Sequence, residues 1–236
     1  MHDSPALSPT QSFTEPDGRG KRSEDTRHAL IEAGIELFGE YGIKGTTSRM
    51  LATASHTNIA AITYHFGSKE GLYLAVVGSI AERMDQHFSQ ADMPRPEELV
   101  GNLLSPPEAV AIFANMIEHM ANLMVDSEKV RTWARIIVRE QSHPTLAFDL
   151  LYEGRMERIQ NMLTALIAVA MGTAPDTPEN KIRAHALIGQ VLGFATSRES
   201  LLRALGVKRL SPTHRDLIRE VLRRHVEVCL SPPLPA

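Results

Sequence analysis

Three short helical segments separated by very short turns lie between residues 24 and 66. Apolar residues recur there at helical spacing and predict helices over about 24–41, 47–54 and 58–66. The turns between them are only three or four residues long. A turn this short makes the second and third helices cross steeply, as in a helix-turn-helix unit. We expect this unit at about residues 47–66, followed by a fourth helix to about Phe88.

The ends of these helices carry residues that favour helix termini. Gly42 ends the first helix, because glycine adopts the left-handed backbone conformation of a C-terminus at little cost. Thr46 or Thr47 is a side-chain cap for the second helix, and Asn58 or its neighbour caps the third. Gly67 then ends the third helix.

The charge over this unit differs from that of the rest of the chain. No Asp or Glu lies between Tyr41 and Lys69, a stretch that also contains Lys44 and Arg49. The whole chain has a formal net charge of −3, so any surface for an anionic partner must be local. A carboxylate-free surface suits the phosphate backbone of DNA. A buried or merely polar segment would have the same composition, and charge alone does not separate the two interpretations.

The segments outside this unit are a Pro- and Ser-rich N-terminus and a long helical C-terminal half. Residues 1–22 contain a short basic run in a flexible setting and predict a disordered arm. Four prolines predict a loop over 89–107. Further helices are expected over about 107–125, 128–142, 145–171, 178–205 and 212–230.

The resulting fold class is all-α. We expect an N-terminal three-helix domain over residues 24–84, a larger C-terminal helical domain over 89–230 and a tail over 231–236.

Signals for membranes, secretion and catalysis are missing from the sequence. No run of about 18 uncharged apolar residues predicts a membrane span, and the N-terminus has no apolar segment typical of a secretory signal. The single Cys229 forms no intrachain disulfide, which suits a reducing cytoplasm. Glu140 and His143 have the spacing of half a di-iron site, but no second Glu-x-x-His is present. With no Walker loop or nucleophile elbow either, we expect a cytoplasmic protein that is not an enzyme and has no metal or cofactor.

The most specific local pattern is TYHFGSKEGLY, which begins at Thr63. With several earlier small and apolar residues, it makes about residues 24–84 resemble the TetR family of bacterial transcriptional regulators. Those earlier residues are Ala33, Leu37, Phe38, Gly42, Thr46, Thr47, Ala52, Ile59 and Ile62. The second half resembles a CerR-type C-terminal domain of that family, through REQSHPTLAFDLLYE and IGQVLGFATSRESLLRALG. The resemblance implies a DNA-binding N-terminal domain, a ligand-responsive C-terminal domain and a homodimer.

The resemblance also implies which side chains contact DNA. Phosphates would be bound from the start of the second helix and from the end of the third, and base edges would be met by small side chains whose methyl groups suit thymine. The phosphate-binding residues implied are Thr46, Thr47, Tyr64, His65 and Lys69, the base-facing residues are Ala60, Ala61 and Thr63, and Arg49 belongs to the same set. His56 and Thr57 stand where the family often has a glycine and an apolar residue, and histidine adopts the left-handed conformation at more cost than glycine.

Side chains for a ligand pocket are expected in the C-terminal domain. Apolar residues recur at helical spacing over 107–125, and methionines among them would make an adaptable wall for apolar ligands. The same spacing is typical of ordinary core packing, as is Trp133, so both interpretations stay open. The candidate ligand-binding residues are Phe113, Met116, His119, Met120, Met124, Trp133 and Arg139.

Apolar stripes also run along the last two long helices. The stripes contain Leu187, Val191, Phe194, Leu201 and Leu202 on one helix, and Leu217, Val221 and Val228 on the other. Such stripes are typical of a chain's own core and also of the symmetric four-helix interface of a dimer.

The leading hypothesis is a DNA-binding regulator, more often a repressor in this family, that binds a palindromic operator as a homodimer. A small, largely apolar effector in the C-terminal domain would relieve operator binding. An all-α enzyme is a second hypothesis, for which the sequence offers no convergent catalytic set. A third is an interaction module with a degenerate helix-turn-helix, against which Tyr64, Lys69 and the acid-free stretch argue.

Overall fold

The computed structural model describes residues 18–90 and 104–231. Every regular element within these ranges is helical, which confirms the all-α fold class. The elements of the first range are α1 (Gly18–Gly45), α2 (Ser48–Ala54), α3 (Ile59–Phe66) and α4 (Lys69–Gln90). Those of the second are α6 (Pro106–Asp126), α7 (Glu128–Ser142), α8 (Leu146–Leu151), the π-helical turn η1 (Tyr152–Met156), α9 (Glu157–Met171), α10 (Pro178–Thr196), α11 (Arg198–Ala204) and α12 (Pro212–Cys229).

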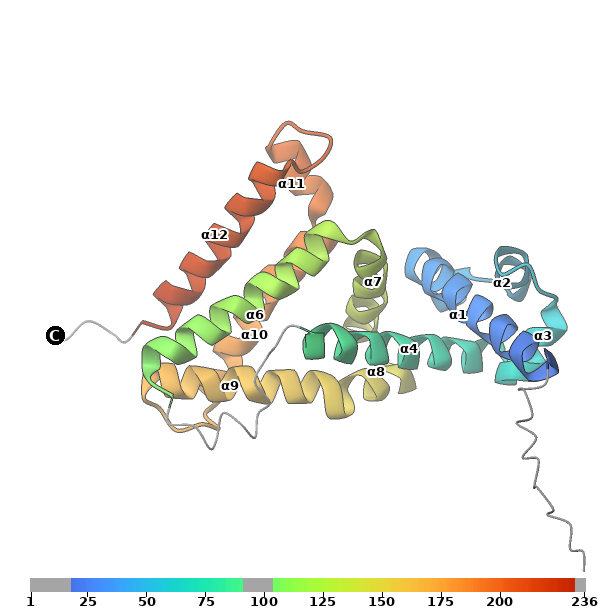
Figure 1. Cartoon of the computed structure of the whole chain (residues 1–236), viewed down its shortest axis with the longest axis horizontal. Coiled ribbons are helices and arrows are strands. Elements are labelled where there is room, and N and C mark those ends of the chain that lie inside the picture. Colours follow the sequence, from blue (N-terminus) through green and yellow to red (C-terminus); the bar gives the residue numbers. More distant parts are fainter. Residues whose placement is uncertain (1–17, 91–103, 232–236) are drawn as a thin grey trace, which may run out of the picture.

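Helices α1 to α4 form one end of an elongated molecule, and α4 runs from α3 toward the C-terminal helices (Figure 1). One apolar core joins this end to α7 and α8, because Trp133, Ile136 and Leu151 pack in the same cluster as Phe38 and Val76. The two predicted domains, residues 24–84 and 89–230, therefore share one apolar core across their predicted boundary. Across this shared core α7 contacts α1, and α8 contacts α4.

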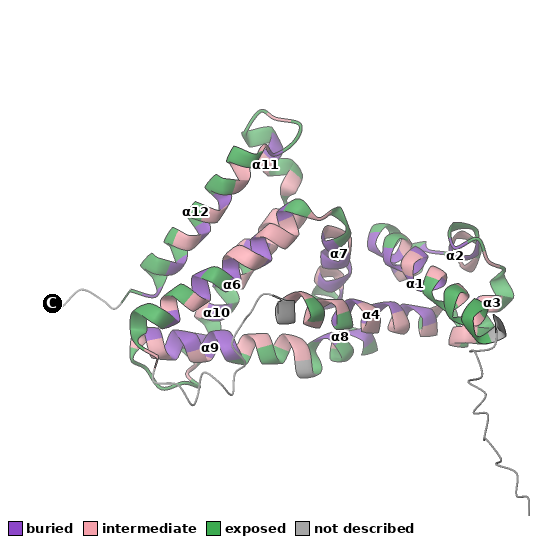
Figure 2. Cartoon of the chain, viewed as in Figure 1, coloured by how far each residue is buried: buried purple, intermediate pink, exposed green. Residues whose placement is uncertain are grey.

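The second core lies around α6, which contacts α7, α9, α10 and α12. Phe113, Ile117, Leu163, Leu187 and Leu222 are buried in it. Because α6 is surrounded on several sides, most of its turns carry a buried residue, whereas α3 and the outer face of α12 are largely exposed (Figure 2).

The helix-turn-helix is held by caps at the predicted positions. Thr47 accepts a hydrogen bond from the Met50 backbone nitrogen at 3.2 Å, and Asn58 accepts one from that of Ala61 at 2.8 Å. His56 lies in the left-handed region with φ of 55°, as its place in the turn predicts. The predicted boundaries of α2 and α3 are thus confirmed.

The first helix begins earlier than predicted. Residues 1–17 of the expected disordered arm lie outside the described residues, but residues 18–22 belong to α1, so the prediction of disorder over 1–22 is wrong for these five. Extending a packed helix adds one backbone bond for each residue ordered, and Lys21 and Arg22 are good helix formers. The Thr26 hydroxyl also donates to the Arg22 carbonyl at 2.9 Å. Gly42 interrupts the far end of α1, with φ of 69°.

Two long predicted helices are interrupted. The helix expected over 145–171 is α8, the π-helical turn η1 and α9, and the helix expected over 178–205 breaks at Ser197 into α10 and α11. Ser197 is not helical, at φ −113° and ψ 24°. Residues 91–103 of the predicted loop and 232–236 of the predicted tail lie outside the described residues.

Candidate DNA-binding surface and ligand pocket

Helix α3 presents a small, mostly uncharged surface to solvent. Ile62 is buried and anchors the helix, whereas Ala60, Thr63 and Tyr64 are exposed, Tyr64 by 81%. Ala61 is half-buried and packs against the core, so of the three residues expected to face bases only two point outward. A helix with this face fits the major groove with little steric obstruction.

Thr46 and Thr47 have different surroundings. Thr46 is fully buried, and its hydroxyl lies 2.8 Å from the Gly42 carbonyl and 3.0 Å from that of Leu37. The predicted phosphate contact of Thr46 is therefore wrong, because the side chain ties the end of α1 to α2. Thr47 is exposed and uses its oxygen as an acceptor, which leaves its hydroxyl proton for a phosphate. Arg49 is exposed on the same helix.

Lys69 has a structural part to play that the sequence did not indicate. Its ammonium donates to the carbonyl oxygens of Ile43 at 2.8 Å and Thr46 at 3.0 Å. These bonds fix the start of α4 against the turn between α1 and α2. One of the three N–H donors of a lysine then remains for a phosphate.

Contacts between the candidate DNA-binding end, which is formed by α1 to α4, and α7 are polar and specific. The Arg139 guanidinium donates to the Phe38 carbonyl at 2.8 Å, and the Tyr73 hydroxyl donates to the buried Glu140 carboxylate at 2.6 Å. Burial, together with this hydrogen bond, raises the pKa of Tyr73 above its usual value. Arg139 thus joins α7 to α1, which corrects its expected role as a ligand anchor.

Glu32 on α1 is a second junction between the two ends of the molecule. It forms ion pairs with Arg83 of α4 and with Lys129 of α7, the latter at 2.9 Å. Burial opposes ionisation of Glu32, but hydrogen bonds and charge from the two cations hold its pKa below the usual value.

An apolar pocket with a cavity volume of about 290 Å³ is lined by residues of α4, α6, α7, α8, η1, α9 and α10. This volume is at the lower end of the range for small-molecule sites. Its wall contains four methionines and three aromatic residues: Met84, Met120, Met124, Met156, Trp133, Phe148 and Tyr152. Its polar groups come from His87, Gln141, Gln160 and His185. Among the described residues, no Asp, Glu, Lys or Arg lines the pocket.

Three of the seven expected ligand residues line this pocket, namely Met120, Met124 and Trp133. Phe113 and Met116 are buried in the core around α6 instead, which corrects their expected role. His119 is also outside the lining. Burial lowers the pKa of His119; a hydrogen bond to the His87 backbone partly offsets this effect, and the charge of His87 adds to it. The other wall residues were not predicted; Tyr152 and Met156 are among them, and their place in the wall follows from the π-helical turn.

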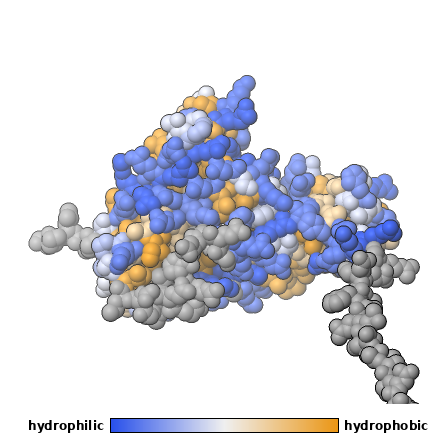
Figure 3. Space-filling model, viewed as in Figure 1, coloured by the Kyte–Doolittle hydropathy of each residue, from blue (hydrophilic) through white to orange (hydrophobic). Residues whose placement is uncertain are grey.

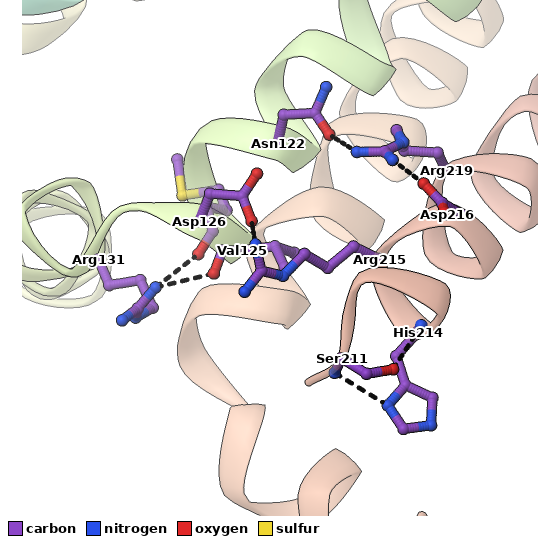
Figure 4. A network of polar contacts seen from close by, with 10 residues as sticks. Asn122, Val125, Asp126, Arg131, Ser211, His214, Arg215, Asp216 and Arg219 are labelled. Atoms are coloured by element: carbon purple, nitrogen blue, oxygen red, sulfur yellow. Dashed lines mark hydrogen bonds and ion pairs between the residues drawn. The ribbon is translucent and has the colours of Figure 1, made fainter. Parts of the chain in front are cut away.

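Helix α12 packs against α6 through buried apolar residues such as Leu222 and through arginines beside them, and it has a second, exposed apolar face. Arg215 pairs with Asp126 at 2.9 Å, and Arg219 donates to Asn122 at 2.8 Å (Figure 4). On the other face Leu217 is 53% and Val228 71% exposed. Apolar patches interrupt the hydrophilic surface of the C-terminal half (Figure 3). The predicted stripe on α10 differs, since Leu187 and Val191 are buried within the chain.

Comparison with known proteins gives two family matches. The model described as bacterial regulatory proteins of the tetR family matches residues 30–76. The model of the C-terminal domain of the HTH-type transcriptional dual regulator CecR matches residues 109–231. This match confirms the C-terminal domain type that the sequence resembles; the family model spells its name CecR and not CerR.

Individual relatives agree with these matches. The chain is 33% identical over 213 residues to CecR of Shigella flexneri, covering 89% of this chain and 93% of the relative. It is 30% identical over 114 residues to the transcriptional repressor AcnR of Corynebacterium efficiens, covering 48% and 59% of the two chains.

Solved structures share the fold. AibR in complex with isovaleryl coenzyme A and operator DNA superposes with a TM-score of 0.61 at 16% identity, covering 88% of this chain and 99% of that one. The multidrug binding protein EbrR with malachite green superposes with a TM-score of 0.53 at 21% identity, covering 87% of this chain and 98% of that one.

Within the described residues no helix is both long and apolar enough to span a bilayer. On the strength of both family matches and the relation to CecR, the chain belongs to the TetR family of bacterial transcriptional regulators and is a DNA-binding regulator with a CecR-type C-terminal domain.

Proposed function

We propose that this regulator is a cytoplasmic repressor that binds a palindromic operator as a homodimer and releases it when a small, uncharged, largely apolar molecule enters the pocket around Trp133. The observation that carries the proposal is the position of the pocket. Met84 and His87 in its wall belong to the same helix, α4, whose first residue Lys69 holds the helix-turn-helix.

Rigid-body transmission along α4 supports the coupling. The helix is continuous for 22 residues, so a displacement near His87 is carried to Lys69 at its other end. Lys69 in turn bonds the carbonyl groups at the junction of α1 and α2. A ligand that fits the pocket better in one position of α4 shifts the population toward that position.

The exposed apolar face of α12 supports a dimer. Leu217, Val221 and Val228 lie on the face opposite the arginines that bind α6, where a second copy can bury them. Two recognition helices related by such a symmetry axis read half-sites about 34 Å apart. A change in their separation then weakens operator binding without altering any contact residue.

The DNA contacts proposed for α2 and α3 predict distinct effects of single substitutions. Tyr64→Ala should weaken binding to every sequence alike, because a phosphate contact carries no base information. Thr63→Ala should change the ranking of operator variants, with about 1–3 kcal/mol at stake for a good base contact. Lys69→Met should lower both the unfolding free energy and DNA affinity, since it loses two backbone bonds. Binding would be measured by fluorescence anisotropy on duplexes that the protein selects from a random pool.

Thr53→Ala is a matched control, because Thr53 is exposed on α2 but is not among the proposed contacts. It should leave affinity and ranking unchanged. A Tyr64→Ala protein that binds as well as the unmodified chain would contradict the proposed phosphate contact.

The composition of the pocket favours an uncharged ligand. A buried ion without a partner is strongly disfavoured, and the described wall offers no side chain of fixed charge to pair with one. Methionine and aromatic side chains instead provide polarizable contacts for ring-containing molecules. The histidines and glutamines supply neutral donors and acceptors for one or two polar groups on the ligand.

Three probes with the same ring test the preference for an uncharged ligand: 1-naphthylacetamide, 1-naphthylacetate and 2-(1-naphthyl)ethylamine. In calorimetric titrations the neutral amide should bind at least about tenfold more tightly than the anion or the cation, which is about 1.4 kcal/mol. If the amide weakens operator binding, its own affinity must fall by the same factor when operator is bound. An affinity unaffected by operator would show that the pocket is not the regulatory site.

Two methionine variants serve as controls for this titration. Met124→Arg places a cation in the wall and should weaken the amide while improving the relative affinity of the acetate. Met116→Leu changes a buried residue outside the wall and should leave all three affinities unaltered.

A further inference from the structure

The first turns of α1 and the end of α3 enclose a shallow hollow at the DNA-binding end. The hollow is lined by Gly20, Arg22, Ser23, Thr26, Tyr64 and His65. Its side chains offer a guanidinium, an imidazole and the hydroxyl groups of Ser23 and Tyr64, with no carboxylate among them, whereas the Thr26 hydroxyl already donates to the Arg22 carbonyl. These are the groups that bind phosphate oxygens in protein–DNA complexes.

The cation in this hollow is unpaired within the described part of the chain. No ion pair or hydrogen bond of the Arg22 guanidinium is found there, and its side chain is exposed. Arginines on α12 are in a different situation, since Arg219, Arg223 and Arg224 each bind a carboxylate. The nearest glutamate along α1, Glu24, is paired with Arg27. Arg22 is therefore available to an anion from outside the chain.

Contacts between α1 and α3 hold the hollow in shape. The Arg27 guanidinium lies over the Phe66 ring at 5.7 Å from its centroid. Within α3, the Tyr64 and His65 rings meet edge to face, with their centroids 4.9 Å apart. Because Arg22 and Ser23 belong to a helix and not to a disordered arm, their direction relative to Tyr64 is set before DNA is bound. A preformed site loses less conformational entropy on binding.

The position of the hollow matches the geometry of the major groove. In the fold, α3 lies between α2 and the first turns of α1 (Figure 1). Thr47 and Arg49 are on the α2 side, and Arg22 and Ser23 are on the α1 side. A helix in the groove has a phosphate backbone on each flank, because the groove is about 12 Å wide and bordered by both strands. Residues on both sides of α3 are therefore near phosphates of opposite strands.

We propose that Arg22, Ser23 and Tyr64 form a second phosphate site, which binds the backbone on the α1 side of the recognition helix while Thr47 and Arg49 bind the strand on the other side. Arg22 supplies the charge and the hydroxyl groups of Ser23 and Tyr64 donate to the same phosphate. The site adds affinity for any duplex and does not select sequence.

Arg22→Gln tests the proposal, with Arg209→Gln as a control that removes the same charge from an exposed loop between α11 and α12. Affinity is measured against salt on two probes: a 30-base-pair duplex of arbitrary sequence and the duplex that the protein selects from a random pool. Loss of one phosphate contact should make the log–log salt slope less steep by about 0.9 and weaken binding about eightfold at 0.1 M salt. Both probes should lose affinity by the same factor, and Arg22→Lys should restore most of the slope.

Ethylation interference locates the contact on the selected duplex. With the unmodified protein, ethylation of phosphates should interfere on both strands flanking each half-site, and Arg22→Gln should abolish interference on one of them. A salt slope and an interference pattern equal to those of Arg209→Gln would overturn the proposal. A changed ranking of sequences would overturn it as well, because Arg22 would then be reading bases.

Discussion

Replacing Gly71 with alanine should separate α3 from α4 and abolish operator binding. A Cβ atom at this position would lie 2.0 Å from the Phe66 carbonyl oxygen and 3.1 Å from its carbon, both backbone atoms. No rotamer change relieves such a contact, so the last turn of α3 must move. We expect the unfolding free energy to fall by about 2–4 kcal/mol, in the upper range for overpacking. The free energy of DNA binding should fall by more than this, because the displaced helix is the one that enters the groove. Urea denaturation and anisotropy titration measure the two effects.

Gly78→Ala is the matched control in the same helix. A Cβ atom at Gly78 would meet nothing within 4 Å, and its backbone is helical. Alanine there should stabilise the protein by about 0.5–1 kcal/mol, because glycine loses more conformational freedom in a helix. DNA affinity should stay unchanged. Equal behaviour of the two variants would mean that the close approach of α4 to Phe66 does not position α3.

The helix-turn-helix could be predicted because its signals are local. Thr47, Asn58 and Gly67 each act on a helix end within three or four residues of themselves, and the structure places each at that end. The left-handed His56 is equally local. Capping and backbone preference depend little on the rest of the fold, so they are readable from the chain.

The roles of Thr46 and Lys69 could not be predicted in the same way. Both are polar residues next to predicted DNA contacts, and only tertiary packing turns Thr46 inward toward the Leu37 carbonyl and Lys69 toward Ile43. Neither partner is identifiable from spacing along the chain.

The pocket was predicted in part for a related reason. Helical spacing identifies an apolar stripe on α6 but not which turns of it face a cavity. Because α6 is surrounded by other helices, Met116 is buried in the core while Met120 and Met124 reach the pocket. The break of the expected helix at Tyr152 also decides which side chains enter the wall, and apolar spacing does not predict it.

Glu140 joins the DNA-binding end to the C-terminal helices by hydrogen bonds to both of its carboxylate oxygens. One oxygen accepts from the Tyr73 hydroxyl at 2.6 Å, and the other accepts from the Thr145 backbone at 3.1 Å and hydroxyl at 2.8 Å. Glu140 and Tyr73 are both buried, whereas Thr145 is exposed. The sequence presented Glu140 only as half of an incomplete metal motif, and its structural role depends on Tyr73 of α4, which lies 67 residues earlier in the chain.

Glu140→Ala should lower the unfolding free energy by about 3 kcal/mol, because it removes hydrogen bonds to a charged group and leaves the buried Tyr73 hydroxyl without a partner. Glu220→Ala, at an exposed ion pair with Arg224 on α12, should change it by less than about 0.5 kcal/mol. The double-mutant cycle of Glu140→Gln with Tyr73→Phe should show coupling of about 1 kcal/mol or more.

Alkaline titration gives an independent readout. Because the folded-state pKa of Tyr73 is raised, the contribution of Tyr73 to the unfolding free energy is complete below about pH 10, where unfolded tyrosine titrates, and is lost as pH rises further. Tyr73→Phe should remove that part of the alkaline decline. Additive single effects, with an unchanged decline, would mean that Tyr73 and Glu140 do not hold the two ends of the molecule together.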